Sequence, residues 1–353
     1  MYAELGLAEA SDPSHPPPLA HERVATLVPG SGELAAAVAD RVRRSEGFEV
    51  ASTTLDQRSF DADLEVQRFL RGGRPSANES GAEPSAAAPH LRAMINFELH
   101  RRKSFWVDGA LAYMLGHTDL DVVGREVRVP FPSFALVFTD RHVLSLLERL
   151  VSRDKTSPVA GHFLRVVTVY VTEERSGDER TLDLRVSCDT LGEDLPHVLT
   201  HRVALEEEGQ VARYLDEVAP RMVVEPPVPD SHPLRGLLRV IVNAILYTTS
   251  ADVERVPRTT PKRTQTVSGP RPVPAFSSEE VYFLPGAIEI THVRRMQELE
   301  RAPTGRTLLR RYMVRGHFRR AAKNWTDQKL RWVQPYWKGP DMAAIIERTY
   351  RLT

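Results

Sequence analysis

A strand-like alternation of apolar and cationic side chains near the C-terminus is the strongest constraint on the fold. Three apolar or aromatic side chains between residues 312 and 319 share one parity, Tyr312, Val314 and Phe318, and three basic ones share the other, Arg315, His317 and Arg319. A period of two predicts a strand with one buried and one charged face. Residues 328–339 alternate less regularly, and the polar residues 320–327 fit a connecting loop. We therefore predict a C-terminal β-hairpin over residues 308–338.

The predicted hairpin is strongly basic, although the chain as a whole has a formal net charge of zero. From Arg306 to Lys338 there are ten Lys or Arg and one acid, Asp327, and three of the four tryptophans lie there too. This pattern fits a solvated sheet face, or a binding surface in which Arg and Trp make paired and stacked contacts. The candidate binding residues are Arg311, Arg315, His317, Arg319, Arg331, Trp325, Trp337 and Lys338. Leu330 and Trp332 share a parity that places them on the inward face.

Two short motifs in the hairpin resemble the C-terminal signature of a known family. They are Arg315-Gly316-His317-Phe318 and Leu330-Arg331-Trp332-Val333-Gln334-Pro335. Both are similar to the signature of a type V-A anti-CRISPR family, which is carried by phages, plasmids and other mobile elements. Similar counterparts exist upstream, in residues 130–138, 237–246 and 281–289. The resemblance runs in order from about Val122 to Pro335.

This resemblance implies a non-enzymatic function. The best known branch of the family blocks production of the type V-A effector nuclease by recognising its emerging N-terminal peptide, and the message is lost. By resemblance, we expect this protein to bind a short or nascent peptide of its target and to lower the target's production. Physically, a strand edge with an Arg/Trp face can capture an extended peptide. The basic residues can also contact phosphates of messenger RNA or the ribosome.

Two other functions remain open from the residues alone. A nucleic-acid-binding protein without a peptide target would use the same arginines and tryptophans. A metal-independent RNase could use His317 as a general base, with Arg315 and Arg319 stabilising a pentavalent phosphate. No second histidine or carboxylate is tied to His317 by the sequence. We therefore assign no catalytic residue, do not expect an enzyme, and keep His317 as the one candidate for catalysis.

No cofactor or metal is expected. His197 and His201 have a spacing that suits a metal site on a helix, but the sequence around them is strand-like. The Gly30-Ser31-Gly32 segment lacks the lysine and the preceding strand of a phosphate-binding loop. A lone cysteine, Cys188, excludes an internal disulfide framework and a thiolate zinc site.

The sequence also predicts a cytoplasmic protein without a membrane partner. Residues 1–20 are polar and proline-rich and do not have the basic start and apolar centre of a signal peptide. The longest apolar run, residues 237–247, contains Arg239 and is shorter than the roughly 20 residues that cross a bilayer. A single cysteine is consistent with a reducing compartment.

Helical and strand-like segments alternate in a way that predicts an α+β fold with a mostly antiparallel sheet. We expect a disordered or draping segment over residues 1–30 and a small helical region over 31–89, with a flexible loop at 72–89. The main α+β domain would span residues 90–353. It would contain a mobile basic loop at 257–274, where prolines and cations occur without an acid.

The expected helices cover residues 33–44, 64–70, a helical stripe from Leu91 to Leu115 with a break near Lys103, 142–150, 206–218, 233–249 and 293–301. The expected strands cover residues 127–138, 164–172, 182–187, 198–205, 280–284 and 287–290. The strands 164–172 and 182–187 are β-rich, and the charged turn 173–180 is expected to join them as a hairpin. The segment Pro233–Thr249 is the most apolar of these and is predicted to be the central core helix.

Overall fold

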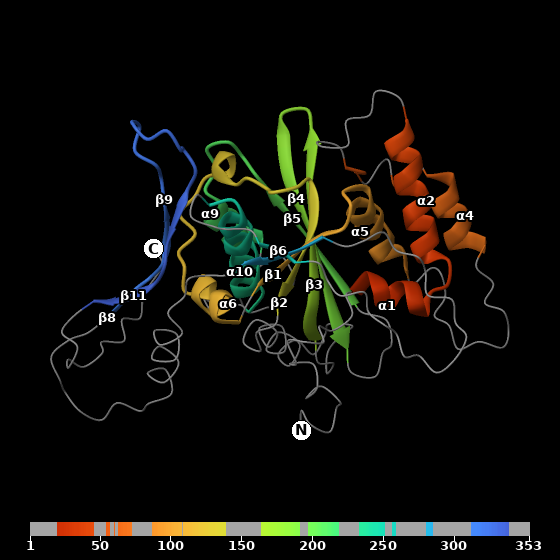
Figure 1. Ribbon diagram of the computed structural model, residues 1–353, viewed down its shortest axis with the longest axis horizontal. Coiled ribbons are helices and arrows are strands. Elements are labelled where there is room, and N and C mark those ends of the chain that lie inside the picture. The colour runs from red at the N-terminus through yellow and green to blue at the C-terminus, as the bar shows by residue number, and fades with distance from the viewer. Residues whose placement is uncertain are drawn as a thin grey trace, which may run out of the picture.

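The computed structural model describes residues 20–45, 54–56, 60, 63–72, 87–107, 109–138, 164–190, 197–218, 233–250, 256–258, 280–284 and 312–338. Figure 1 shows four layers: N-terminal helices, a central sheet, a second set of helices and a C-terminal hairpin. The strands of the sheet are β1 (Lys103–Val107), β2 (Ser133–Phe138), β3 (Leu164–Ser176), β4 (Glu179–Thr190), β5 (His197–Ala204), β6 (Val256–Arg258) and β7 (Glu280–Leu284). Their order is β5-β4-β3-β2-β1-β7-β6.

The sheet is mostly antiparallel, which confirms the predicted α+β class. Strand β1 pairs in parallel with β2 and β7, and the other four pairs are antiparallel. The long hairpin of β3 and β4 confirms the expected pairing, but its turn is the two residues Gly177 and Asp178 rather than the charged segment 173–180. Gly177 has φ +61°, a conformation that glycine adopts without strain.

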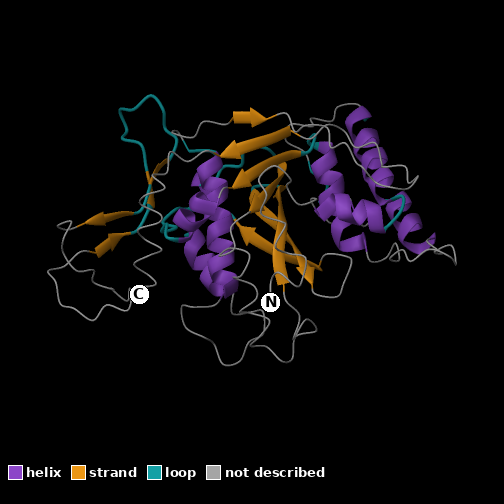
Figure 2. Cartoon of the chain, turned by 60° about the horizontal axis from the view of Figure 1, so that its bottom comes forward, coloured by secondary structure: helices purple, strands orange, loops and turns teal. Residues whose placement is uncertain are grey.

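Helices cover both faces of the sheet (Figures 1 and 2). On one side lie α1 (Ala20–Leu27), α2 (Ser31–Arg44), α4 (Leu64–Gly72) and α5 (Ala88–Leu99). On the other side lie α6 (Gly109–Gly116), α9 (Val211–Val218) and α10 (Pro233–Thr248). A 3-10 turn, Gly124–Glu126, precedes β2. None of the described helices is both long and apolar enough to cross a membrane.

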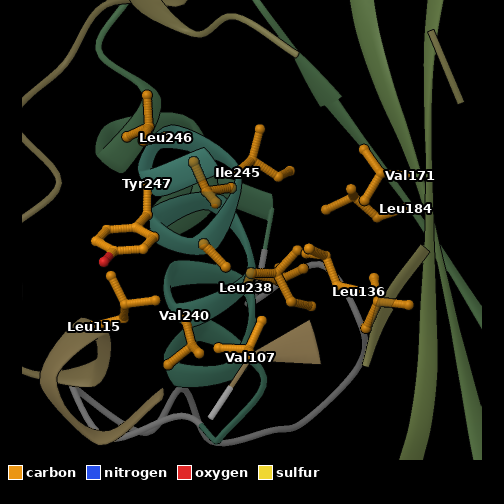
Figure 3. Close-up of a cluster of buried hydrophobic side chains, with 14 of the residues drawn as sticks. Val107, Leu115, Leu136, Val171, Leu184, Leu238, Val240, Ile245, Leu246 and Tyr247 are labelled. Carbon is orange, nitrogen blue, oxygen red and sulfur yellow. The ribbon is translucent and has the colours of Figure 1, made fainter. Parts of the chain in front are cut away.

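The main core forms where α10 packs against the sheet (Figure 3). Leu238 and Ile245 point toward side chains of β2, β3 and β4, among them Leu136 and Leu184. All four side chains are fully buried. Tyr247 points to the opposite side of α10, toward the outer layer (Figure 3). The predicted central core helix is thus confirmed, and it is buried on two sides because it is apolar around most of its circumference.

Successive side chains of a strand point to opposite faces, and the other face of β3 and β4 carries buried charged side chains. Arg92 of α5 is 1% exposed and pairs with Glu174 and with Asp183, whose Oδ2 is 3.5 Å from the guanidinium. Arg185 donates from Nε to the same Asp183 oxygen at 2.9 Å. Burial lowers the pKa of Arg92 to about 10, and the charge of Asp183 opposes that shift. The charges are tolerated here because they are paired with one another.

Among the described residues, one predicted element is of the wrong type and two begin later than predicted. Residues 103–107 form β1 rather than part of a helical stripe. The helix ends before them because Arg101 and Arg102 have φ of 60° and 51°, which turns the chain into the sheet. Strand β2 begins at Ser133 rather than near residue 127, since Pro130 and Pro132 have no N–H to donate. Helix α9 begins at Val211, not at residue 206.

Several predicted segments lie partly or wholly outside the described residues. Within the predicted draping segment 1–30, residues 20–27 form α1, and residues 1–19 are not described. The predicted loop at 72–89 is described at residue 72 and at 87–89, and the basic loop at 257–274 only at residues 257 and 258. The elements expected at 142–150, 287–290 and 293–301 are not described. The division at residue 90 stays a prediction, although α2 and α4 share a buried cluster with α5.

We expect His201 to make stability depend on pH. It lies on the apolar face of β5 opposite Leu184, its Nε2 has no hydrogen-bond partner among the described residues, and burial lowers its pKa to about 4. The unfolded chain, with a pKa near 6.5, therefore binds more protons between pH 4 and 6.5. The free energy of unfolding should fall by up to about 3 kcal/mol as the pH drops through this range.

Urea unfolding of the wild type and of His201→Leu at several pH values checks this expectation. The leucine variant should be as stable as the wild type or more stable at pH 7, because no buried polar atom is left unpaired. Its free energy of unfolding should also fall less than that of the wild type as the pH drops from 6.5 to 4. Parallel pH profiles for the two proteins would show that His201 does not titrate differently on folding.

Candidate functional site

The C-terminal hairpin consists of two antiparallel ladders, and this confirms the prediction for residues 308–338 over the described part. Strand β8 (Tyr312–Val314) pairs with β11 (Tyr336–Lys338), and β9 (His317–Arg319) pairs with β10 (Arg331–Val333). The register is the same in both ladders. Figures 1 and 2 place the hairpin beyond α6 and α10, on the side away from the N-terminal helices.

The two ladders are separated where Arg315 and Gly316 face Gln334 and Pro335. Pro335 has no N–H, so it cannot complete the ladder. Gly316 bonds instead to the segment after α6: its N–H donates to the carbonyl of His117 at 3.1 Å, and its carbonyl accepts from the N–H of Asp119 at 2.7 Å. This parallel bridge, centred on Thr118, attaches the hairpin to the body of the protein.

Close packing around this bridge requires glycine at position 316. A Cβ atom there would lie 2.6 Å from Oγ1 of Thr118, 2.8 Å from Cδ of Pro335 and 3.0 Å from the carbonyl oxygen of Val333. The first two distances are shorter than any ordinary carbon contact, and two of the three neighbours are constrained by the backbone or a ring. Gly316 is therefore a requirement of the attachment rather than a flexible position.

The inward face of the hairpin packs on α10, as the parity of the sequence predicts. Phe318 is 6% exposed and belongs to the main core, and Leu330 and Trp332 pack against that core. The indole of Trp332 meets the ring of Tyr247 edge-on, with 5.0 Å between centroids. Its Nε1 donates to Oγ1 of Thr118 at 3.2 Å. The aromatic side chains thus hold the hairpin against the helix.

Two ion pairs add to this attachment. Nε of Arg315 lies 3.1 Å from Oδ1 of Asp119. Arg320 donates to both oxygens of Glu126, at 2.5 and 2.9 Å. Burial by itself would raise the pKa of Glu126, but the hydrogen bond from Arg320 and a backbone N–H from Val123 hold the pKa below its usual value. Arg315 and Arg320 therefore position the hairpin.

The outward face carries a second, different group of cations. Arg319 and Arg331 are direct cross-strand partners, on the face opposite to Phe318 and Trp332. The ring of Trp325, from the connecting loop, lies against both guanidinium groups, with 5.3 Å from its centroid to Cζ of Arg319 and 4.3 Å to Cζ of Arg331. We call these three residues the Arg–Trp cluster. Arg319 is exposed, while Trp325 and Arg331 are half-buried.

The loop itself holds Trp325 in place. The side-chain amide of Gln328 donates to the carbonyl oxygens of Trp325, at 2.5 Å, and of Ala322, at 3.2 Å. The N–H of Trp325 also donates to the carbonyl of Ala322, at 2.9 Å. These bonds fold residues 322–328 into a turn. The tryptophan consequently keeps its place over the arginines without depending on other elements.

The structure brings three of the eight predicted binding residues together: Arg319, Trp325 and Arg331. Arg315 points to Asp119 and belongs to the attachment. His317 is half-buried and pairs with Val333 across the hairpin. Arg311 lies outside the described residues.

The last two predicted residues, Trp337 and Lys338, are in β11 opposite Met313 and Tyr312. Sequence reasoning missed the partners Thr118, Asp119 and Glu126, because they lie about two hundred positions away in the chain and no local pattern marks them. No group of three His, Cys, Asp or Glu side chains in the described part of the chain could hold a metal ion.

Comparison with known families places the chain among the anti-CRISPR proteins. The family described as AcrVA2-like, anti-CRISPR type V subtype A2, matches residues 105–340, a span that includes both ladders of the hairpin. Because this is more than half of the sequence, the chain belongs to the AcrVA2-like family. The resemblance of residues 122–335 to a type V-A anti-CRISPR family is thereby confirmed.

A solved structure is also similar to the chain. It is titled "Crystal structure of AcrVA2", with 14% sequence identity and a TM-score of 0.44, and the match covers 88% of this chain and 93% of that one. No curated protein matches the sequence.

Replacing Gly316 by alanine should loosen the hairpin. The added methyl group would displace Thr118 or Pro335, and we expect a loss of about 1–3 kcal/mol in the free energy of unfolding. Urea unfolding measures this loss. Gly116→Ala is a matched control, because its Cβ would meet only the Val240 side chain at 3.7 Å. Equal stability of the two variants would contradict the tight attachment at Gly316.

Trp332 contributes to stability through its ring contact with Tyr247 and through its hydrogen bond to Thr118, and two substitutions separate these contributions. Trp332→Ala removes the contact with Tyr247 and should cost about 3 kcal/mol, the lower end for a large aromatic residue, because the indole is only half-buried. Trp332→Phe keeps a ring but loses the hydrogen bond to Thr118 and should cost about 1 kcal/mol. Thermal unfolding measures both. A wild-type midpoint for the alanine variant would mean that the indole does not contribute to packing.

Proposed function

We propose that this protein is an anti-CRISPR that binds a short peptide of a type V-A effector as it is made, and thereby lowers the effector's production. In this proposal the C-terminal hairpin is the binding element. Contact with the message or the ribosome, through the basic residues of the same hairpin, accompanies peptide binding.

The observation that carries the proposal is the family match over a hairpin that is fixed on one face and open on the other. The match spans residues 105–340. The inward face is attached through Trp332, Gly316 and two ion pairs, so the outward face keeps a constant orientation. A surface that is already ordered loses little entropy when it binds a partner, and this favours recognition of a short segment.

The charge of the outward face supports a polymer partner. Arg319, Lys323 and Lys329 are exposed, and Arg331 is half-buried. The acid of this loop, Asp327, accepts from the N–H of Lys329 at 3.0 Å. An extended peptide can pair with strand edges and place side chains against such cations. Phosphates of a nearby RNA can bind the lysines as point charges.

A catalytic function for His317 has less support. Its cross-strand partner is Val333, and no described residue forms a hydrogen bond or ion pair with its ring. A general base normally has a second group that orients it. The two arginines that would flank it differ in environment, because Arg315 is paired with Asp119.

Co-expression with type V-A effector genes tests the proposal. For each effector, one gene version is recoded synonymously over its first codons, which keeps the peptide and changes the RNA. A second version is shifted in frame over the same codons and restored downstream, which keeps the RNA nearly unchanged and alters the peptide. Effector protein and message are measured with and without this protein. We expect effector levels to fall for the recoded gene and to stay constant for the frame-shifted gene.

The variant Arg319→Gln/Arg331→Gln should lose the effect while folding normally, since it removes two like charges that face each other across the strand pair and have no described acid as partner. Arg44→Gln, on the exposed surface of α2, is the matched control. If effector levels fall for the frame-shifted gene and not for the recoded gene, the protein recognises the RNA and not the peptide, and the proposal is wrong. Cleavage of RNA by the purified protein, lost in His317→Ala, would replace it by nuclease activity.

A further inference from the structure

Two arginines face each other in the hairpin without a described acid between them. Arg319 and Arg331 occupy paired positions of β9 and β10. Like charges directly across a strand pair are destabilising. The neighbouring Arg315 and Arg320 each have a carboxylate partner, whereas among the described residues Arg319 and Arg331 have none. Two cations therefore lie together in the hairpin, and no acid in the described part of the chain neutralises them.

A second observation concerns a single atom of Arg331. Its Nε is buried and has no hydrogen-bond partner among the described residues. A buried donor without an acceptor costs free energy, which is recovered when a ligand supplies the acceptor. The Trp325 ring covers the guanidinium at 4.3 Å but accepts no conventional hydrogen bond from Nε. One buried donor of the Arg–Trp cluster, Nε of Arg331, is thus without an acceptor among the described residues.

We propose that Arg319 and Arg331 form a carboxylate-binding site and that the peptide bound by this surface is acidic. The inference rests on the proposed peptide binding and specifies the chemistry of the peptide. Each guanidinium stacked on an aromatic ring directs its N–H groups sideways, where a carboxylate accepts two parallel hydrogen bonds. One or two Asp or Glu side chains of the peptide would supply these acceptors, and Lys323 and Lys329 would attract further negative charge.

An acidic peptide fits this cluster better than a single strand of RNA does. Recognition of single strands depends on aromatic rings whose faces are free to stack on bases. The ring of Trp325 is instead in contact with both guanidinium groups, so it does not offer two free faces to bases. Trp325 acts as a positioning residue: its ring contacts both guanidinium groups, and these cation–π contacts offset part of their mutual repulsion. The groups left to bind a ligand are the N–H donors.

Fluorescence anisotropy with the purified full chain tests the inference. The probes are a labelled peptide of alternating glutamate and serine, the same peptide with glutamine in place of glutamate, and an oligouridine with the same number of negative charges. We expect the glutamate peptide to bind, the glutamine peptide to bind at least about tenfold more weakly, and the oligouridine to bind more weakly than the glutamate peptide.

Five variants and one control, Arg44→Gln, locate the site. Arg319→Gln and Arg331→Gln should each weaken binding of the glutamate peptide about tenfold, and Arg44→Gln should leave its affinity unchanged. Lysine at both positions should restore only part of the affinity, because it cannot bind a carboxylate with two parallel bonds. Trp325→Ala should weaken binding, and Trp325→Phe should recover most of it. This recovery separates positioning of the arginines from a contribution of the indole to folding.

Three results would overturn the inference: equal affinity for the two peptides, full affinity after Arg319→Gln/Arg331→Gln, or tighter binding of the oligouridine. Together with the co-expression experiment, these binding measurements distinguish failure of the site from failure of the proposed function. Selective peptide binding without any change in effector production would retain the carboxylate site and reject the proposed function. Reduced production that persists in the double variant would retain the function and reject the site.

Discussion

Burial of α10 is the constraint on which the rest of the structure depends. This helix is apolar around most of its surface, so the sheet cannot cover it alone. Leu238 and Ile245 pack on the sheet, while Tyr247 faces outward and meets Trp332 of the hairpin. From the same helix, Asn243 donates to the carbonyls of Leu115 and Thr118, both at 3.0 Å, and so fixes the segment to which the hairpin binds.

The side chains of the hairpin alternate between an inward and an outward face, and the two faces have different roles. Its inward residues complete the cover of α10, and its outward residues gather cations that no described residue neutralises. The distinction does not follow parity alone, since Arg315 shares its parity with Arg319 and yet pairs with Asp119. The position of Arg315 beside the interrupted ladder explains this difference. At that point the hairpin touches the segment after α6, and a carboxylate is within reach.

Much of the fold is predictable because its signals are local. Alternation identified the C-terminal hairpin, β-rich composition on both sides of a charged segment identified the pair β3–β4, and the apolar segment 233–249 identified α10. The strand β1 was not predictable, because its residues Phe105 and Val107 are equally apolar in a helix, and the turn at Arg101 and Arg102 depends on tertiary packing. The same holds for the site. The sequence showed which residues are cationic, but which of them are paired depends on acids distant in the chain.

The attachment and the Arg–Trp cluster are built from different residues, so their properties are separable. Trp325, Gln328 and the two cross-strand arginines are contributed by the hairpin alone, and their geometry follows from its register and its turn. Thr118, Glu126 and Tyr247 determine where the hairpin lies on the body. A substitution in the attachment therefore changes the orientation of the Arg–Trp cluster relative to the body of the protein. Such a substitution has less effect on the affinity of the cluster for a small anion. Recognition of an extended polymer, which touches both hairpin and body, depends on both.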